Sequence, residues 1–459
     1  MGIFGALTTA VSGLQAQSYA LENISGNIAN SQTTGYKRTD TSFADLVLSG
    51  DLNVNRQVSG SVQAFSRSSN EVQGTLQSSS SGTSIAINGS GFFVVQDSSG
   101  QVDGKPTFGG GDLYTRRGDF TVDKNGYVVN GAGYFLKGLA VDSKTGNPTG
   151  SASEIIKLSN DFYPAEATTS ITYRANLASA PQTANYVSGD ESSWLLGSSF
   201  GANVTADQSD AFIASSVSGD AVTVYDDKGT AYDVQFRWGK VTNEDATAGT
   251  QDTWALYYLS DPAATGSENA WTKVDADPAA AGTQNYVFNS DGALVAPSDG
   301  VTSIANLTID GKSLGAVTLD HGTGLTQYAD TNGAVTTKQL TQNGVSSGNV
   351  VSVSINDGGL VNATYSNGKS RTLYKVPVVS FYADNQLSHV DGGAYQQTVA
   401  SGAPIAGEGE IVGSALEQSN VDIADEFSKM IVTQQAYSAN TRVVTTSDSM
   451  MQDTLSMVR

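Results

Sequence analysis

The sequence predicts a mainly β protein with α-helical termini, in which the N- and C-terminal helices pair as a coiled-coil-like base and nested β domains are inserted between them. Apolar residues recur at every seventh position at both ends of the chain, which is the spacing of helices that pack along their length. The residues between form short alternating runs separated by glycine-containing turns, which is typical of β-strands. With 459 residues, the chain is long enough for roughly two to four domains.

The C-terminal stretch, 416–459, predicts the longer helix. It contains neither Gly nor Pro, and Ser419 with Asp422 predicts a capping box at its start. One heptad row is apolar throughout: Leu416, Ile423, Met430, Tyr437, Val444, Met451 and Val458. The companion row is largely polar: Asn420, Phe427, Gln434, Thr441, Asp448 and Leu455. A single helix cannot bury such a stripe by itself, so the pattern predicts a packing partner.

That partner is predicted at the other end of the chain, in a helix that ends near Asn30. Its apolar row is Leu7, Leu14, Leu21 and Ile28, and its companion row is Ala10, Gln17 and Ile24. The same spacing also fits an ordinary amphipathic pair that closes a globular core. The placement of both helices at the extreme termini favours completion of the stripes by neighbouring copies. The residues predicted to pack in such an assembly are these two apolar rows together with Ile24, Phe427 and Leu455.

Between the helices, the sequence predicts three nested parts. Residues 1–32 and 415–459 would form the helical base. Residues 33–84, which are rich in Ser and Gln, read as linker or disorder, or with 405–414 as an extended arm that orders only against neighbours. Residues 85–177 with 348–404 would form a first β domain, and 178–347 an inserted outer β domain that could be two domains.

Alternating runs predict the strands of these domains. Residues 85–87 and 92–95 read as strand, turn and strand, and 120–129 reads as a hairpin turning at Asn125-Gly126. In the middle, Tyr232, Val234, Phe236 and Trp238 alternate as on a half-buried strand. Further strands are predicted at 254–259, 286–288, 350–355, 360–365 and 376–382.

Composition argues against several classes of function. The net charge of −21 argues against nucleic acid or anionic membranes as partners, since phosphate binding needs clustered Lys and Arg. The chain has no Cys, and hence no disulfide, Cys-ligated zinc or Cys nucleophile. No positively charged leader and no apolar run of membrane-spanning length are present, so neither a cleaved signal peptide nor a transmembrane helix is expected.

No residue is predicted to be catalytic, to bind a cofactor or to ligate a metal. His321 and His389 are the two histidines, and a zinc site without Cys is not expected. Residues 123–126 and 289–292 look like fragments of a calcium loop, but the remaining ligands and the closing Glu are missing, so hairpin turns are predicted instead. Residues 89–91 lack the third Gly and the helix of a dinucleotide loop.

Three motifs, in this order along the chain, resemble the axial rod and hook proteins of the bacterial flagellum. Residues 29–37 are similar to the family's A-N-x-x-T-x-G-Y-K element, which here comprises Ala29, Asn30, Thr33, Gly35, Tyr36 and Lys37. Residues 88–93 with 114–120 are similar to its first β domain. Residues 416–422 are similar to its L-E-x-S-N-V-D element, with Ser419, Asn420, Val421 and Asp422. The resemblance covers roughly residues 1–140 and 350–459.

The long insert resembles the hook branch of this family, because rod proteins carry little between the flanking segments. The resemblance implies a subunit that polymerises into a flexible helical tube, transmits motor torque from rod to filament and encloses an export channel. Gln17, Gln434, Thr441 and Asp448 are candidates to face that channel. It also implies type III export, an extracellular place in the hook, and rod, hook-cap and hook–filament junction proteins as partners.

Three other functions stay open from the sequence. A distal rod protein of the basal body differs from a hook subunit mainly in the size of the insert. A secreted β-rich adhesin or calcium-binding surface protein would give no reason for heptads at both ends. A glycan-acting enzyme would need a cleft with paired carboxylates, which one sequence cannot reveal.

Overall fold

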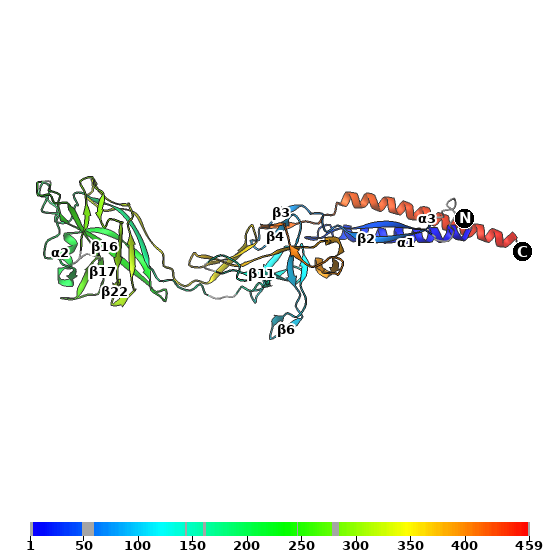
Figure 1. Ribbon diagram of the computed structural model, residues 1–459, viewed down its shortest axis with the longest axis horizontal. Coiled ribbons are helices and arrows are strands. Elements are labelled where there is room, and N and C mark those ends of the chain that lie inside the picture. Colours follow the sequence, from blue (N-terminus) through cyan, green and yellow to red (C-terminus); the bar gives the residue numbers. More distant parts are fainter. Residues whose placement is uncertain are drawn as a thin grey trace. The chain divides into compact units, whose positions relative to one another are not determined.

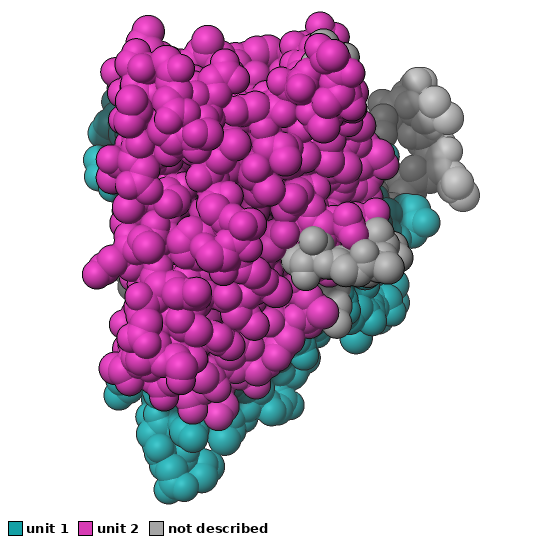
Figure 2. Space-filling model, turned by 90° about the vertical axis from the view of Figure 1, so that its left-hand side faces the viewer, with its two compact units in different colours: residues 1–161, 350–459 teal, residues 162–349 magenta. Residues whose placement is uncertain are grey.

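The structure is a computed structural model that describes residues 3–47, 59–142, 145–158, 162–245, 247–277 and 284–457. It divides into two compact units, unit 1 with residues 1–161 and 350–459 and unit 2 with residues 162–349, coloured separately in Figure 2. The predicted fold class is confirmed. The protein is mostly β, the helices at the two ends are in contact, and the β domains lie between them in the sequence.

The terminal helices α1 (Ile3–Ala29) and α3 (Ile423–Met457) lie side by side and antiparallel in unit 1 (Figure 1). Gly13 of α1 faces Asn440 of α3, and Asn27 of α1 bonds to Glu426 of α3. The predicted pairing of the two ends is therefore confirmed within one chain.

The predicted start of the C-terminal helix is wrong. Leu416 lies in the short strand β35 (Ala415–Glu417), which pairs with β3 (Leu76–Ser78). The helix begins at Ile423, and Asp422 caps it by accepting hydrogen bonds from the N–H groups of Ala424 at 2.8 Å and Asp425 at 3.2 Å. Because residues 415–417 pair as a strand, Leu416 does not belong to the apolar row of the helix, which begins with Ile423. Val458, the last residue of the predicted row, lies outside the described residues.

The polar segment after α1 is ordered as a β-hairpin rather than as linker. Strands β1 (Thr39–Val47) and β2 (Ser59–Ser68) pair antiparallel and lie along α1. Polar contacts hold them there: the hydroxyl oxygens of Tyr19 and Ser66 are 2.6 Å apart, and Asn23 donates to the hydroxyl of Thr41 at 2.8 Å. Since the hairpin packs through hydroxyl and amide groups, its sequence shows little apolar alternation. Residues 48–58 lie outside the described residues.

The β domain of unit 1 is built around a 13-stranded sheet. Its main path runs β27 (Val350–Ile355), β28 (Leu360–Tyr365), β29 (Ser370–Lys375), β11 (Phe135–Ala140), β5 (Phe92–Gln96), β8 (Leu113–Thr115), β32 (Ala394–Gln396) and β31 (Ser388–Val390). Joined to this path are β9 (Phe120–Val122), β10 (Val128–Asn130), β12 (Glu154–Ile155), β30 (Val378–Ser380) and β33 (Ile405–Ala406). Two further pairs are β4 (Ile85–Asn88) with β34 (Glu410–Gly413), and β6 (Gly100–Val102) with β7 (Lys105–Thr107). Short 3-10 helices lie at η2 (Asp384–Gln386) and η3 (Asp391–Gly393).

The predicted hairpin at 120–129 is confirmed by the pairing of β9 with β10. Gly126 takes the positive φ of the turn, at 83°, and the Asp123 carboxylate accepts the N–H of Tyr127 at 2.7 Å. The predicted strand at 376–382 is shorter and covers the three residues of β30.

Unit 2 holds two larger sheets and a small hairpin. The five-stranded sheet contains β21 (Val301–Ile304), β24 (Val317–Asp320), β13 (Ser170–Ala178), β25 (Leu325–Tyr328) and β26 (Thr336–Gln342). The seven-stranded sheet contains β14 (Asn203–Thr205), β18 (Asn269–Lys273), β17 (Asp252–Leu259), β16 (Ala231–Thr242), β15 (Val217–Tyr225), β19 (Tyr286–Phe288) and β20 (Leu294–Ala296). Beside them lie the hairpin β22 (Thr308–Ile309) with β23 (Lys312–Ser313), the helix α2 (Ser209–Ala214) and the 3-10 turn η1 (Ala206–Gln208).

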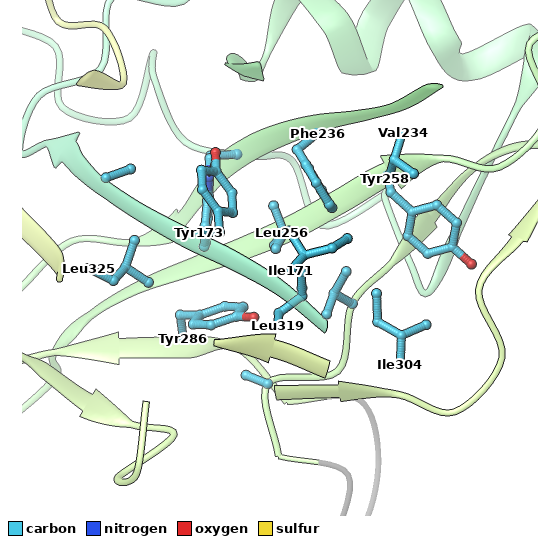
Figure 3. Packing of buried hydrophobic residues seen from close by; sticks show 14 of the residues in the cluster. Ile171, Tyr173, Val234, Phe236, Leu256, Tyr258, Tyr286, Ile304, Leu319 and Leu325 are labelled. Carbon is cyan, nitrogen blue, oxygen red and sulfur yellow. Dashed lines mark hydrogen bonds between the residues drawn. The ribbon is translucent and has the colours of Figure 1, made fainter. Parts of the chain in front are cut away.

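The two sheets of unit 2 share one apolar core (Figure 3). The predicted alternation on β16 is confirmed, since Val234, Phe236 and Trp238 are buried in this core. Strand β13 also belongs here, because Tyr173 on it packs against Phe236 and because β13 pairs with β24, β25 and β26. Unit 2 therefore begins at residue 162, ahead of the boundary drawn from the sequence at 178.

A buried polar cluster crosses this core around His321. The imidazole is fully buried, with Nδ1 2.8 Å from the carbonyl oxygen of Tyr173 and Nε2 3.1 Å from the hydroxyl oxygen of Tyr286. Burial lowers the pKa of His321 to about 4, against an ordinary value of 6.5. The folded protein therefore holds this histidine neutral at pH values where an unfolded chain would protonate it.

We expect unit 2 to lose stability as the pH falls from 6.5 toward 4. The unfolded chain takes up a proton on His321 over this range and the folded chain does not, so unfolding becomes easier by about 3 kcal/mol. Urea denaturation followed by tryptophan fluorescence measures this, because all four tryptophans lie in unit 2. His321→Gln should flatten the pH dependence between 6.5 and 5. An unchanged slope in that variant would contradict the assignment.

Candidate assembly surface

The buried face of α1 is a stripe of mostly small residues, spaced three or four apart as one helix face requires. Its members are Ala10, Gly13, Ala16, Ala20, Ile24 and Asn27. A Cβ atom on Gly13 would lie 2.9 Å from Nδ2 of Asn440, so the two helices approach closely at that point. This close approach explains why the stripe is built from Ala and Gly.

The larger apolar side chains of α1 lie beside this stripe and remain partly exposed to solvent. Leu7, Leu14, Leu21 and Ile28 are all half-buried, as is Gln17, whereas Ile24 is buried. An α-helix of 3.6 residues per turn rotates a seven-residue row by about 20° per heptad, so the leucine row does not stay on the face that meets α3. Its role in assembly remains a prediction.

On α3 the side that meets α1 combines buried polar residues with half-buried apolar ones. The buried residues of this helix are Glu426, Thr433 and Ser447. Among the positions predicted from the heptads, Met430, Val444 and Met451 are half-buried, while Gln434, Thr441 and Asp448 are exposed. The packing of α3 against α1 therefore leaves most of its apolar surface uncovered.

We call the uncovered apolar residues of α3 the exposed α3 set. It comprises Ile423, Phe427, Ile431, Val432, Tyr437, Val443, Met450, Leu455 and Met457. Ile431 is 56% exposed and Val432 65%. At about 100° per residue, Phe427 and Ile431 lie on one flank of the α1-facing side, and Val432 and Val443 on the other. Exposed apolar residues gathered on one helix make α3 a candidate protein interface.

A polar anchor fixes the helix pair at the end of α1. Asn27 donates to the Glu426 carboxylate at 3.0 Å and accepts the N–H of Thr39 at 2.9 Å. Glu426 also lies 2.7 Å from the ammonium of Lys429, which is 3.2 Å from Asp40. Asn27 and Glu426 were not predicted from the sequence. A buried carboxylate and amide facing each other set the register of α1 against α3, because neither can be left unpaired.

Beyond this anchor, the first and last sequence motifs lie alongside each other. We call residues 35–38 with 415–420 the motif junction. The N–H of Gly35 donates to the carbonyl of Glu417 at 2.8 Å, and the N–H of Arg38 donates to the side-chain oxygen of Asn420 at 2.7 Å. The backbone of Asn420 also bonds to the carbonyl of Tyr36 at 3.3 Å. The chain leaving α1 is thus held against the chain entering α3.

The other motif residues shape the approaches to the junction. Thr33 donates to the side-chain oxygen of Asn30 at 3.1 Å in the turn after α1, while Ala29 is exposed. Ser419 and Val421 are half-buried, and Asp422 is the helix cap described above.

A buried charge triad lies at the centre of the junction. The Lys37 ammonium is 2.5 Å from Oε1 of Glu417, and Nη1 of Arg116 is 3.3 Å from Oε2. Their side chains are at most 1% exposed. Burial lowers the pKa of Lys37, and the Arg116 charge adds to that effect while Glu417 opposes it. Glu417 and Arg116 belong to the quoted motifs, yet neither was predicted as a site residue.

Gly35 makes the contact of the junction with the β domain possible. Its φ is 69°, in the left-handed region that favours glycine. A Cβ atom there would lie 2.7 Å from the carbonyl carbon of Arg116, which follows β8.

Within the described ranges, no group of three or more His, Cys, Asp or Glu side chains is arranged to hold a metal ion. The two suspected calcium-loop fragments are turns, in which Asp123 and Asn289 accept backbone N–H groups of their own loops. Among the helices of the same ranges, none combines the length and the apolar character needed to cross a bilayer.

Four family models match separate parts of the chain. The model described as "Flagella basal body rod protein" matches residues 7–37, and "Flagellar hook protein FlgE/F/G D1 domain" matches 86–172. "Flagellar basal body protein FlaE D2 domain" matches 200–345, and "Flagellar basal body rod FlgEFG protein C-terminal" matches 412–457.

Full-length relatives decide between the branches of this group. The flagellar hook protein FlgE of Brucella suis biovar 1 (strain 1330) is 31% identical over 98% of this chain and 98% of that protein. The chain belongs to the flagellar hook protein family. The hook protein FlgE of Salmonella typhimurium (strain LT2) is 30% identical over 96% of this chain and 97% of its own length. A solved structure of Helicobacter pylori flagellar hook protein FlgE2 aligns with 74% of this chain and 100% of its own chain, at a TM-score of 0.45 and 14% identity.

Hook proteins are structural proteins rather than enzymes, and this chain is a structural subunit of the bacterial flagellar hook. A hook protein assembles with copies of itself in the flagellum. The assignment favours the hook over the distal rod, adhesin and glycan-acting enzyme that the sequence left open.

Proposed function

We propose that this hook protein polymerises through its terminal helices into a flexible helical tube that transmits torque from the rod to the filament. One observation carries the proposal: the residues of α3 that are buried in the single chain are Glu426, Thr433 and Ser447, while most of its large apolar side chains stay exposed. A helix that closed a self-contained core would show the opposite arrangement. In the proposed tube, this uncovered surface contacts another copy of the protein.

The distribution of that surface fits a polymer better than a closed dimer. Apolar residues lie on two flanks of α3, and the leucine row of α1 offers a further half-buried surface. When one patch of a subunit docks on a different patch of the next and the ring does not close, an open helical filament results. Two flanks give each α3 two neighbours, which such a filament requires.

The remaining expectations belong to the same proposal. The polar positions Gln17, Gln434, Thr441 and Asp448 would face a wet export channel inside the tube. The subunit would leave the cell through the type III export apparatus and act outside it. It would assemble between the rod and the hook–filament junction proteins, under a hook cap.

Electron microscopy of concentrated protein tests the proposal. The full chain should form tubes, whereas a chain ending at residue 422 should stay monomeric, because it lacks α3 and with it the exposed α3 set. The tryptophan fluorescence of unit 2 should be the same in both, which shows that unit 2 of the shortened chain is folded, and far-UV circular dichroism should show the strands of unit 1 retained. Dispersed particles from the full chain, or tubes from the shortened one, would overturn the proposal.

A further inference from the structure

The motif junction is where the helix pair joins the β domain of unit 1. The chain leaves α1 through residues 30–38 and returns to α3 through 415–422. Arg116 lies in the loop between β8 and β9 and forms an ion pair with Glu417 of the second segment. Glu417 in turn pairs with Lys37 of the first segment. After the first segment, the chain forms the β1–β2 hairpin along α1 and returns through residues 69–75, which also contact the junction, so a load carried along the chain between the helices and the β domain crosses 69–75 or 415–422.

The charges at this point do not balance. Two cations, Lys37 and Arg116, meet one carboxylate, that of Glu417, and all three are buried. Glu417 also accepts the N–H of Gly74 at 2.8 Å. Asp384 also attracts Arg116, but among the described residues Glu417 is the carboxylate that forms an ion pair with it. Glu417 is therefore the anion on which both buried cations depend.

The cations are tied to different parts of the fold. Lys37 also donates to the carbonyl of Val72 at 2.6 Å. Arg116 donates to the carbonyl of Gly89 at 2.8 Å and lies over the ring of Phe92, 5.5 Å from its centre. Residues 72–74 precede β3, and Phe92 lies in the core of the sheet. One carboxylate thus connects the exit of α1, the entry to α3 and the β core.

We propose that Glu417 is the positioning residue of the joint between the helix pair and the β domain, and that it makes the two move as one body under load. The proposal deepens the proposed function and rests on it only where tubes are measured. Hydrogen bonds and packing still connect the segments when the carboxylate is lost, but two buried cations then face each other uncompensated. The joint opens to hydrate them.

Because the junction carries one more positive than negative charge, the proposal predicts different effects for the loss of the anion and the loss of one cation. Glu417→Gln removes the anion and leaves two buried cations, so it should strongly favour opening of the joint. Lys37→Met keeps a balanced Arg116–Glu417 pair and a side chain of similar length, so its effect on opening of the joint should be small. A site that acted only through packing or hydrogen-bond number would respond similarly to both changes.

Trypsin cleavage of the full-length monomer measures the opening of the joint, because α3 carries Lys429 and Arg442 while α1 has no basic residue. We expect cleavage at these sites to rise about 100-fold in Glu417→Gln, through a larger open population. Lys37→Met should stay within about tenfold of the parent protein. Asp119→Asn should stay within about twofold, because the Arg117–Asp119 pair on the same loop is partly exposed.

A readout in the assembled tube separates positioning from stability alone. Tubes of Glu417→Gln, if they form, should show a wider spread of curvature in electron micrographs than parent tubes, and Lys37→Met tubes should match the parent. Failure of the parent protein to form tubes would count against the proposed function alone. Equal trypsin protection in Glu417→Gln and the parent would overturn the role of Glu417, whether or not tubes form.

Discussion

Replacing Ile431 by Asp is expected to stop tube formation while the monomer stays folded. Ile431 is 56% exposed on one flank of α3 and supports no core in the single chain. In the assembled tube a neighbour would cover it, and a charge buried there without a partner costs several kcal/mol. We expect the critical concentration for polymerisation to rise at least about 100-fold, since every 1.4 kcal/mol is tenfold. Sedimentation of protein at increasing concentration measures this.

Two controls separate apolar contact from other effects of the substitution. Ile431→Leu keeps the apolar area and should polymerise like the parent protein. Ser428→Asp adds the same charge to an exposed polar position between the two flanks, and should also polymerise. Tubes from Ile431→Asp at the parent concentration would show that this flank of α3 stays outside the interface.

The second large effect is expected for Gly35→Ala, which should destabilise unit 1 by about 3 kcal/mol. The new methyl group meets two obstacles. A φ of 69° is unfavourable for any residue with a Cβ, and the Cβ would lie 2.7 Å from a backbone carbon of Arg116. Urea denaturation followed by far-UV circular dichroism measures the loss. The tryptophan signal of unit 2 should not change, because all four tryptophans lie there.

Gly26→Ala is the matched control, since Gly26 lies in α1 with no neighbouring atom within 4 Å of an added Cβ. It should stabilise the protein by up to about 1 kcal/mol, because Ala favours a helix over Gly. Equal stability of Gly35→Ala and the parent protein would mean that the junction relaxes around the methyl group, and that Gly35 is not required there.

Periodicity predicted that the two end helices exist and pair, but not which faces meet. The buried stripe of α1 consists of Ala and Gly, which a search for large apolar residues passes over in favour of Leu14 and Leu21. The fully buried residues of α3 are polar, whereas the apolar heptad residues Met430, Val444 and Met451 are only half-buried, so the usual rule that apolar residues are the most buried ones fails on this helix.

The motif junction could not be predicted from the sequence for a different reason. Glu417 and Lys37 lie 380 residues apart, and charged residues are exposed by default, so neither could be expected to meet inside the protein. The hairpin of β1 and β2 was missed because hydroxyl and amide contacts such as Asn23 to Thr41 leave no alternating apolar pattern. Strands with apolar alternation, such as β16, were predicted well.

The antiparallel course of α1 and α3 has a practical consequence for labelling. Gly13 lies opposite Asn440, so the first residues of α1 and the last turns of α3 emerge at the same end of the helix pair. A fluorescent or affinity tag fused to either terminus would therefore crowd the surface of α3 that we propose contacts neighbouring subunits. The turn between β15 and β16, where Asp227 and Lys228 are exposed, offers a place for an inserted tag in the other unit.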